Sequence, residues 1–328
     1  MPEPDPVSAV PDRSLTPDAF GPGRLHFAGV GGSGMSALAQ FAAMQGAPVS
    51  GSDRSFDRGQ NPGARERLER LGIRIFPQDG SAVSGDCGAV VYSTAVEEQV
   101  PDFAEARRQG VPLLHRSELL ARFVASRRTL AVTGTSGKST TVAMVFEILR
   151  GAGRDPSVIT GGELRALQCE GLWGNAWAGA SDLLVIEADE SDGCLVRCPP
   201  AVGVVLNLQR DHKEMDVVAG MFRTFRDQVR ERLVVGEAPN LDEFRPGSLV
   251  FGFGPGAGVR AEALEERPEG CVFRVDGVRF QLSVPGRHNA ENALAAIAAC
   301  RAVGVPREAM TAPLADFQGV ARRYEVLG

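Results

Sequence analysis

The sequence contains no apolar run near the roughly 20 residues that a membrane-spanning helix requires. Its N-terminus is rich in proline and aspartate, and it lacks the charged start and hydrophobic core of a secretory signal. Both absences argue against a membrane-inserted or exported protein. The expected location is therefore the cytoplasm.

Concentrated blocks of lysine and arginine are also absent, and the formal net charge of the 328 residues is -6. Because clustered positive charge is what binds a nucleic-acid backbone, this composition argues against a nucleic-acid partner. Isolated basic pairs, Arg127-Arg128 and Arg322-Arg323, still suit a small phosphorylated ligand.

Cysteine is too sparse and too scattered for a disulfide framework. The chain has six cysteines and is long enough to fold without covalent cross-links, as expected of reduced thiols in a reducing compartment. Cys194 and Cys198 are the only close pair, and no neighbouring cysteine or histidine completes a metal site with them. We interpret both as small buried residues.

The chain does contain 43% apolar residues and 39 glycines, spread over alternating strand and helix patterns. This length and content predict an α/β protein of two domains rather than one. Residues 1–23 have the composition of a flexible leader. The predicted domains are residues 24–125 and 126–321.

In the first domain, an apolar strand is followed by a glycine-rich turn and an apolar helix, and the alternation then continues. This pattern predicts parallel β-α-β units with crossover helices, which is a Rossmann-like sheet. The predicted strands are 25–30, one ending at 50–53, 73–76 and 89–93, and the predicted helices are 35–45, 64–71, 101–109 and 117–124.

The second domain begins another alternating series at Thr129, and it has the order of a P-loop-type ATP-binding domain. The continuous apolar runs 183–186 and 202–206 are typical of strands covered on both faces. Asp276-Gly277 predicts the turn of a hairpin over 272–282. Helices are predicted over 140–150 and 289–302.

The most informative segment, 129–141, passes from an apolar strand through two glycines into Lys138-Ser139 and a helical pattern. Glycines let backbone N–H groups approach an anion, and a helix N-terminus adds partial positive charge. Lys138 can reach terminal phosphates and Ser139 can ligate magnesium, although Val132 stands where the longer P-loop motif has its first glycine. The motif predicts ATP binding by Gly134, Thr135, Ser136, Gly137, Lys138, Ser139 and Thr140.

A second glycine turn, at residues 29–34, fits the Gly-x-Gly-x-x-Gly fingerprint of dinucleotide-binding proteins. Asp53 stands at the end of the next strand, where a ribose-binding acid belongs. The turn suggests NAD, but the same geometry holds any diphosphate over a helix N-terminus, including that of a UDP-sugar. From the residues alone, both ligands stay open.

A dense acidic segment, 187–192, follows the apolar run 183–186. Carboxylates at this place can bind Mg²⁺ that bridges ATP phosphates, because hard cations prefer oxygen ligands. Glu187 is nearest the strand end and is the best single ligand candidate. The alternative is a solvated acidic turn.

Two further polar segments carry candidate site residues. His212 follows the run 202–206 on the edge where the phosphate-site elements converge, although a lone histidine often has only a structural role. His288, Asn289 and Asn292 open a predicted helix, where they either recognise a base or cap the helix.

Taken in order, these pieces resemble the Mur ligase family. They most resemble its branch that joins L-alanine to UDP-N-acetylmuramate and the related murein peptide ligases. An ordered set of motifs is far more specific than any one of them, and the resemblance runs from about residue 24 to residue 328. The motifs lie at residues 29–36, 51–53, 134–141, 187–192, 211–212, 288–293 and 319–323.

The resemblance implies that the first domain holds a UDP-muramoyl substrate rather than NAD. It implies that Lys138 binds the β- and γ-phosphates of ATP and that Ser139 and Glu187 bind magnesium. It implies that His212 binds a second metal or the reacting phosphate. The resemblance places His288, Asn289 and Asn292 at the adenine region. Arg322, also implied to bind ATP, lies in a hinge, residues 322–328, toward a third domain. The residues implied for the UDP-sugar are Gly31, Gly32, Ser33, Gly34, Met35, Asp53, Ser93 and Asn175.

The implied activity is ATP- and Mg²⁺-dependent joining of UDP-N-acetylmuramate to L-alanine through an acyl phosphate, with Lys138, Glu187 and His212 in the catalytic centre. The alternatives are a murein peptide ligase that adds a recycled tripeptide, a noncatalytic nucleotide-sugar-binding protein and, more distantly, a dehydrogenase. Ser136 stands where this branch usually has histidine. The family's third domain does not follow within the sequence, so we expect ligation to require it, from a longer chain or from a partner.

Overall fold

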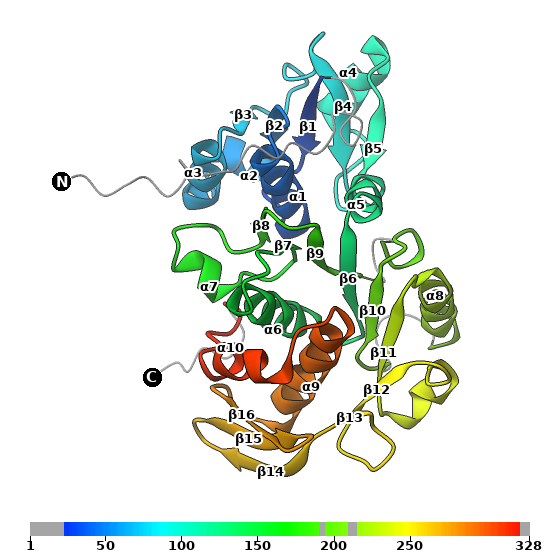
Figure 1. The fold of residues 1–328 in the computed structure, drawn as a ribbon. Helices are drawn as coiled ribbons and strands as arrows, with labels where there is room; N and C mark the ends of the chain where they lie inside the picture. The colour runs from blue at the N-terminus through cyan, green and yellow to red at the C-terminus, as the bar shows by residue number, and fades with distance from the viewer. Residues whose placement is uncertain (1–22, 190–193, 209–214, 322–328) are drawn as a thin grey trace, which may run out of the picture.

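A computed structural model describes residues 23–189, 194–208 and 215–321 of the chain. Two α/β units follow one another, and a small sheet lies beyond the second unit (Figure 1). The first unit is blue and cyan in Figure 1, and the second begins in green.

The first unit is built on a five-stranded parallel sheet in the order β3-β2-β1-β4-β5. The predicted Rossmann-like sheet is confirmed, and its crossover helices pack on it as β-α-β alternation requires. The strands are β1 (Arg24–Ala28), β2 (Val49–Ser52), β3 (Arg74–Phe76), β4 (Cys87–Tyr92) and β5 (Leu113–His115). The helices are α1 (Ser33–Met44), α2 (Arg54–Asp57), α3 (Pro62–Arg70), α4 (Pro101–Gln109) and α5 (Arg116–Ala125).

Two short elements of this unit escaped sequence analysis. Strand β5 has three residues and pairs with β4 at the sheet edge. Helix α2 has four residues and begins after Asp53, whose side chain accepts a hydrogen bond from the Ser55 N–H. Elements this short hold too few residues for a hydrophobic period to appear.

The second unit is built on an eight-stranded sheet in the order β13-β12-β11-β10-β6-β9-β7-β8, in which only the β7–β8 pair is antiparallel. The strands are β6 (Arg128–Thr133), β7 (Ser157–Ile159), β8 (Ala176–Trp177), β9 (Leu183–Glu187), β10 (Val202–Val205), β11 (Arg232–Gly236), β12 (Leu249–Gly252) and β13 (Val259–Arg260). The helices are α6 (Lys138–Gly151), α7 (Arg165–Gln168), α8 (Met215–Gln228), α9 (Arg287–Ala302) and α10 (Thr311–Ala315), with 3-10 turns η2 (Cys194–Val196), η3 (Pro239–Phe244) and η4 (Arg307–Met310).

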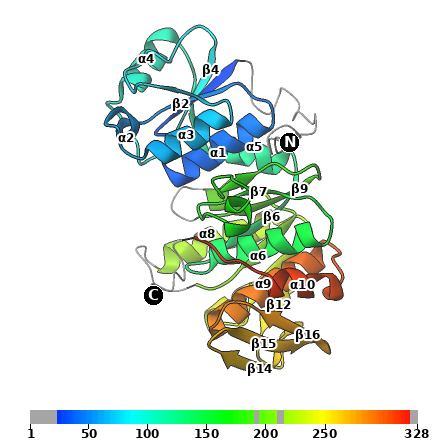
Figure 2. The ribbon, with the colours of Figure 1, turned by 90° about the vertical axis from the view of Figure 1, so that its left-hand side faces the viewer.

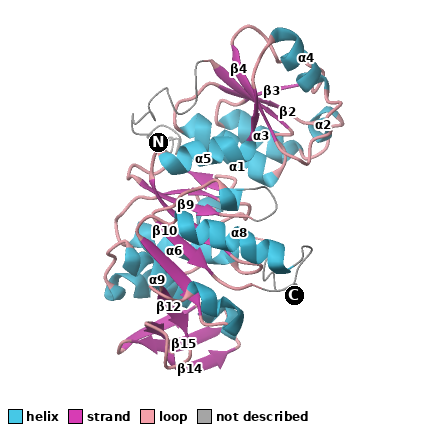
Figure 3. Cartoon of the chain, turned by 90° about the vertical axis from the view of Figure 1, so that its right-hand side faces the viewer, coloured by secondary structure: helices cyan, strands magenta, loops and turns pink. Residues whose placement is uncertain are grey.

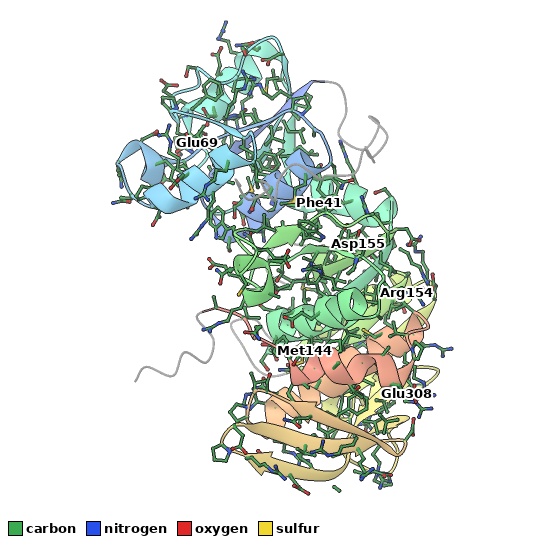
Figure 4. All side chains as sticks on the ribbon, turned by 60° about the vertical axis from the view of Figure 1, so that its left-hand side comes forward. Phe41, Glu69, Met144, Arg154, Asp155 and Glu308 are labelled. Atoms are coloured by element: carbon green, nitrogen blue, oxygen red, sulfur yellow. The ribbon has the colours of Figure 1, made fainter. Side chains whose placement is uncertain are left out.

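Both faces of this sheet are covered, as its continuous apolar strands predicted. Leu130 and Val132 of β6 face the core that includes α6 and α9, whereas Ala131 between them faces the opposite core. Helix α6 packs directly against the alanine-rich α9, with Met144 fully buried between them (Figure 4). Figure 2 shows this helix pair between the large sheet and the small one.

The small sheet contains the predicted hairpin. Its antiparallel strands are β14 (Glu262–Arg267), β15 (Gly270–Val275) and β16 (Val278–Leu282), seen at the bottom of Figure 3. Asp276 and Gly277 have φ angles of 47° and 83°, and they connect the paired residues Val275 and Val278. Two positive φ angles are what a tight two-residue hairpin turn requires, so the Asp-Gly prediction is confirmed.

The two units share one continuous apolar core. Phe41 of α1, labelled at their junction in Figure 4, packs edge-on against Phe123 with ring centroids 5.0 Å apart. Arg127, between α5 and β6, lies 5.5 Å from the Phe41 ring centroid and donates to Gln45 Oε1 at 2.7 Å. Apolar packing and a charged hydrogen bond therefore hold the units together.

Within the described residues, no helix has the length and apolar character needed to cross a bilayer. Among these residues, Cys87, Cys169, Cys198, Cys271 and Cys300 are not in disulfide bonds.

Candidate functional site

The polar segments selected in the sequence meet at one edge of the large sheet. Strands β9 and β10 flank β6 and run parallel to it, so all three carboxyl ends open on the same edge. The glycine loop follows β6, Glu187 ends β9 and Asn207 follows β10. The residues at and after the carboxyl ends of β6, β9 and β10 therefore form one site.

The loop between β6 and α6 has the backbone of a phosphate cradle. Gly134 and Gly137 have φ angles of 144° and 85°, which other residues rarely adopt, and a Cβ at Gly137 would overlap Asn292 Oδ1. Lys138 Nζ donates to Gly134 O at 2.8 Å and lies 3.9 Å from Asp189 Oδ2. The ammonium group thus sits between the cradle and the acidic segment, where it can reach terminal phosphates.

Asn207 holds the cradle from the neighbouring strand exit. Its Oδ1 accepts hydrogen bonds from Thr135 Oγ1 at 2.8 Å and Ser136 N at 3.0 Å, and its Nδ2 donates to Ser136 O at 3.1 Å. Sequence analysis gave Asn207 no role of its own, although its position directly after a buried strand was an available signal.

Ser139 and Glu187 flank two consecutive glycines. Glu187 Oε2 accepts from Gly161 N at 3.0 Å, and a Cβ at Gly162 would lie 2.9 Å from Ser139 Cβ. Glu187 Oε1 is buried and has no hydrogen-bond partner among the described residues. A buried, unpartnered carboxylate oxygen near a serine hydroxyl fits Mg²⁺, so these two residues could hold it.

The part of the chain that the structure describes contains no cluster of three or more His, Cys, Asp or Glu side chains arranged for a metal. The magnesium prediction therefore rests on the mixed pair Ser139 and Glu187. His212, predicted as a further ligand, lies outside the described residues.

A pocket of about 560 Å³ lies beside the cradle. It brings His288, Asn289 and Asn292 of α9 next to Ser136, Gly137 and Thr140, which were predicted to bind the same nucleotide. Asn289 Nδ2 donates to Pro285 O at 2.7 Å, so part of its amide serves the turn before the helix. The size and mixed lining of the pocket suit a nucleobase.

Glu291 lines this pocket and was not selected from the sequence. Burial raises the pKa of its carboxyl group, Arg287 and His288 partly oppose that rise, and Glu237 adds to it. The only sequence signal was its place one turn after His288.

Asp53 shapes the glycine turn of the first unit. Its Oδ2 accepts from Gly31 N at 2.8 Å, and its Oδ1 accepts from Ser55 N at 2.9 Å. Helix α1 then begins at Ser33 with no acidic residue in its first turn. Its N-terminal N–H groups and dipole therefore suit an anion, as the fingerprint predicted for Gly31, Gly32, Ser33 and Gly34.

Asn175 holds the same turn from the second unit. It is 1% exposed, its Nδ2 donates to Ser33 O at 3.0 Å and Ser36 Oγ at 2.9 Å, and its Oδ1 accepts from Gln40 Nε2 at 2.7 Å. Its side chain thus supports the turn, and direct contact with a muramoyl group stays a prediction.

The remaining residues predicted for the UDP-sugar are buried. Met35 is 3% exposed within the apolar core, so its backbone is the part that faces the turn. Ser93, just after β4, is 8% exposed. Their roles stay predictions, as does that of Arg322, which lies outside the described residues.

A second pocket, of about 140 Å³, lies between the two units. Ser33, Gly34 and Arg116 line it from the first unit, and Glu187 and Asp189 line it from the second. The glycine turn and the acidic strand exit therefore border one space, although they belong to different sheets.

Both units match models of known protein families. The model described as the Mur ligase family, catalytic domain, matches residues 24–128, and the Mur ligase middle domain matches residues 132–300. The chain belongs to the Mur ligase family. The resemblance drawn from the ordered motifs is thereby confirmed.

Curated members of the Mur ligase family give the same picture. A UDP-N-acetylmuramate–L-alanine ligase of Phenylobacterium zucineum is 38% identical over 336 aligned residues, covering 95% of this chain and 68% of the relative. The enzyme of the same name from Synechococcus elongatus is 36% identical, covering 93% of this chain and 66% of the relative. The chain thus spans about two thirds of the length of these relatives.

Solved Mur ligase structures share the fold. The UDP-N-acetylmuramate–alanine ligase of Thermotoga maritima superposes with a TM-score of 0.80 at 28% identity, covering 93% of this chain and 71% of that one. A murein peptide ligase of Psychrobacter arcticus has the same fold, with a TM-score of 0.81 at 24% identity over 93% of this chain and 70% of that one. The predicted α/β architecture is confirmed.

Proposed function

We propose that this chain holds the UDP-sugar and ATP sites of an ATP-dependent ligase that joins the carboxylate of UDP-N-acetylmuramate to the amino group of L-alanine. The observation that carries the proposal is the pocket between the units. Ser33 and Gly34 of the first glycine turn and Glu187 and Asp189 beside the phosphate cradle line the same space. The names of the curated relatives support this choice of substrates.

The proposed chemistry is carboxylate activation followed by amide formation. A carboxylate oxygen attacks the γ-phosphorus, the bond to the ADP oxygen breaks, and an acyl phosphate forms. The neutral amino group of alanine then attacks the acyl carbon, loses a proton and expels phosphate. The products are the amide, ADP and phosphate, and negative charge develops in both transition states.

The residues of the cradle would stabilise that charge. The Lys138 ammonium lies at the cradle, and Gly134, Gly137 and the N-terminus of α6 would receive the β- and γ-phosphates, while the N–H groups of Thr135 and Ser136 bind Asn207. Mg²⁺ held by Ser139 and Glu187 would neutralise phosphate charge. Because the glycine turn and the cradle sit on units with a common core, the reactants are held near one another.

Three alternatives remain distinguishable by experiment. A murein peptide ligase would use a tripeptide in place of L-alanine, and competition between the two amines in the complete enzyme separates them. A noncatalytic nucleotide-sugar-binding protein would bind the UDP-sugar without ever consuming ATP. A dehydrogenase would bind NAD at residues 29–34. A cytoplasmic location is also part of the proposal.

Calorimetric titration of the chain with UDP-N-acetylmuramate, and separately with Mg-ATP, tests the two sites. Asp53→Ala should weaken the binding of UDP-N-acetylmuramate, because it removes the hydrogen bonds that Asp53 accepts from Gly31 N in the turn and from Ser55 N at the start of α2. Lys138→Ala should weaken the binding of Mg-ATP, because it removes the ammonium group at the cradle. Each variant is the control for the other, since the two side chains lie in different units.

Binding of NAD without UDP-N-acetylmuramate would reject the proposal for the first unit. An absence of ADP formation by the complete enzyme, given ATP, UDP-N-acetylmuramate and several amines, would reject the ligase itself.

A further inference from the structure

Arg116 belongs to none of the sequence motifs, but in the structure it lies at the first glycine turn. It is the first residue of α5, directly after β5. His115 Nδ1 accepts from Ser117 N at 3.3 Å, which caps the helix and fixes where it begins. The parallel pairing of β5 with β4 sets the position of this helix start relative to the turn.

The guanidinium group of Arg116 packs against Gly34. A Cβ built at Gly34 would overlap Arg116 Nη1. The backbone of Gly34 needs no positive φ angle, because it is already helical. Glycine at this position therefore serves the close approach of the arginine rather than an unusual backbone conformation.

The surroundings of Arg116 suit an anionic ligand. The first turn of α1 has no acidic residue and no side-chain cap, so its N–H groups and positive dipole end face the turn. Glu187 and Asp189 line the same pocket from the second unit. The first unit therefore contributes the positive groups, Arg116 and the start of α1, and the second unit contributes the acidic ones.

We propose that Arg116 binds the diphosphate of the UDP-sugar, as a cation that complements the glycine turn. This inference rests on the proposed function, because it takes the UDP-sugar as ligand. The planar guanidinium can donate two parallel hydrogen bonds to phosphate oxygens and carries a full positive charge, a geometry that a lysine does not offer. The diphosphate is favoured over the muramoyl carboxylate because the contact of Arg116 is with Gly34, at the helix N-terminus.

The test uses Arg116→Gln and Arg116→Lys, with Arg122→Gln as matched control. Arg122 lies on the same helix and is exposed. Calorimetric titration with UDP-N-acetylmuramate, UDP and uridine separates the contributions of the muramoyl group, the diphosphate and the nucleoside. Thermal unfolding of each variant shows that it is folded.

Arg116→Gln should lower the affinities for UDP and for UDP-N-acetylmuramate by the same factor, about 10- to 100-fold. This is the loss expected when charge-assisted hydrogen bonds to the diphosphate are removed. Uridine affinity should not change, and Arg122→Gln should match the wild type with every ligand. The UDP affinity of Arg116→Lys should lie between those of the wild type and Arg116→Gln, because lysine keeps the positive charge but loses the two parallel hydrogen bonds. It also supplies the answer if the glutamine variant does not fold.

Unchanged UDP affinity in both Arg116 variants would overturn the inference and leave the proposed function standing. A loss confined to UDP-N-acetylmuramate would also overturn it, because the contact would then be with the muramoyl part. Wild-type protein that binds none of the three ligands would instead reject the proposed function itself.

Discussion

Asn175 of the second unit donates a hydrogen bond of 3.0 Å to the carbonyl oxygen of Ser33 in the glycine turn of the first. The Asn175 backbone oxygen also accepts from Thr160 N at 3.0 Å, next to Gly161, whose N–H binds Glu187. A short chain of bonds therefore connects the proposed diphosphate turn with the proposed magnesium ligand. The two sites share a scaffold although they lie on different sheets.

Asn175→Ala should lower the free energy of unfolding by about 1–3 kcal/mol, because it removes the buried hydrogen bonds that Asn175 makes with Ser36 Oγ and Gln40 Nε2. It should also weaken UDP-sugar binding by loosening the turn. A double-mutant cycle with Gln40→Ala, followed by urea unfolding, should give a coupling energy of about 0.5–3 kcal/mol. Strict additivity of the two substitutions would show that this pair does not couple the units.

Gly137→Ala should abolish measurable ATP binding and leave UDP-sugar binding intact. The new methyl group would need a positive φ angle and would also overlap Asn292 Oδ1. Gly153→Ala is the matched control, because Gly153 has a φ angle of 71° but no atom within 4 Å of an added Cβ. Both variants should lose about 1–2 kcal/mol of stability from backbone strain. Equal ATP affinities in the two variants would contradict a cradle at Gly137.

Glu187→Gln should raise the Mg²⁺ concentration needed for tight ATP binding by about tenfold or more, as lost ligand-sphere carboxylates generally do. The amide retains an acceptor for Gly161 N but loses the charge at the unpartnered Oε1 position. A Mg²⁺ titration at fixed ATP measures the effect. Glu231→Gln is the control, because Glu231 pairs with Arg128 at the opposite end of β6. An identical Mg²⁺ dependence in both variants would exclude Glu187 as a ligand.

Burial raises the pKa of Glu147 on α6 to about 8 from 4.5, although the Gln318 N–H and Arg150 partly oppose this. Between these pH values the unfolded chain ionises while the folded one keeps its proton. The free energy of unfolding should therefore fall as pH rises, by about 1 kcal/mol per pH unit from this group, and level off above pH 8.

Glu147→Gln should remove that component of the pH dependence, measured by urea unfolding between pH 5 and 9. Glu308→Gln is the control. Glu308 is exposed, is labelled in Figure 4 and lines the same surface pocket as Glu147. Its substitution therefore removes one negative charge from that pocket without touching Glu147. A wild-type pH profile in the Glu147 variant would refute the proposed titration.

Local patterns were enough to predict much of the fold and the cradle. The apolar runs of β9 and β10 predicted strands buried on both faces, because successive side chains point to opposite sides. Gly137 before Lys138 and Asp276 before Gly277 set φ angles that few other residues adopt. Such features depend on neighbours in the chain, so the sequence alone determined them. The ordered motifs added family membership.

Only the tertiary structure decided which of these pieces touch. Asn207 reaches Thr135 across 72 residues, and Asn175 reaches Ser33 across 142. Arg116 meets Gly34 only after α5 docks beside the glycine turn. No local period or propensity encodes such contacts, because they arise from sheet order and from the apolar packing that joins the two units. The sequence therefore determined the two glycine loops, and packing brought the first of them to one pocket with Glu187 and Asp189, which lie beside the second.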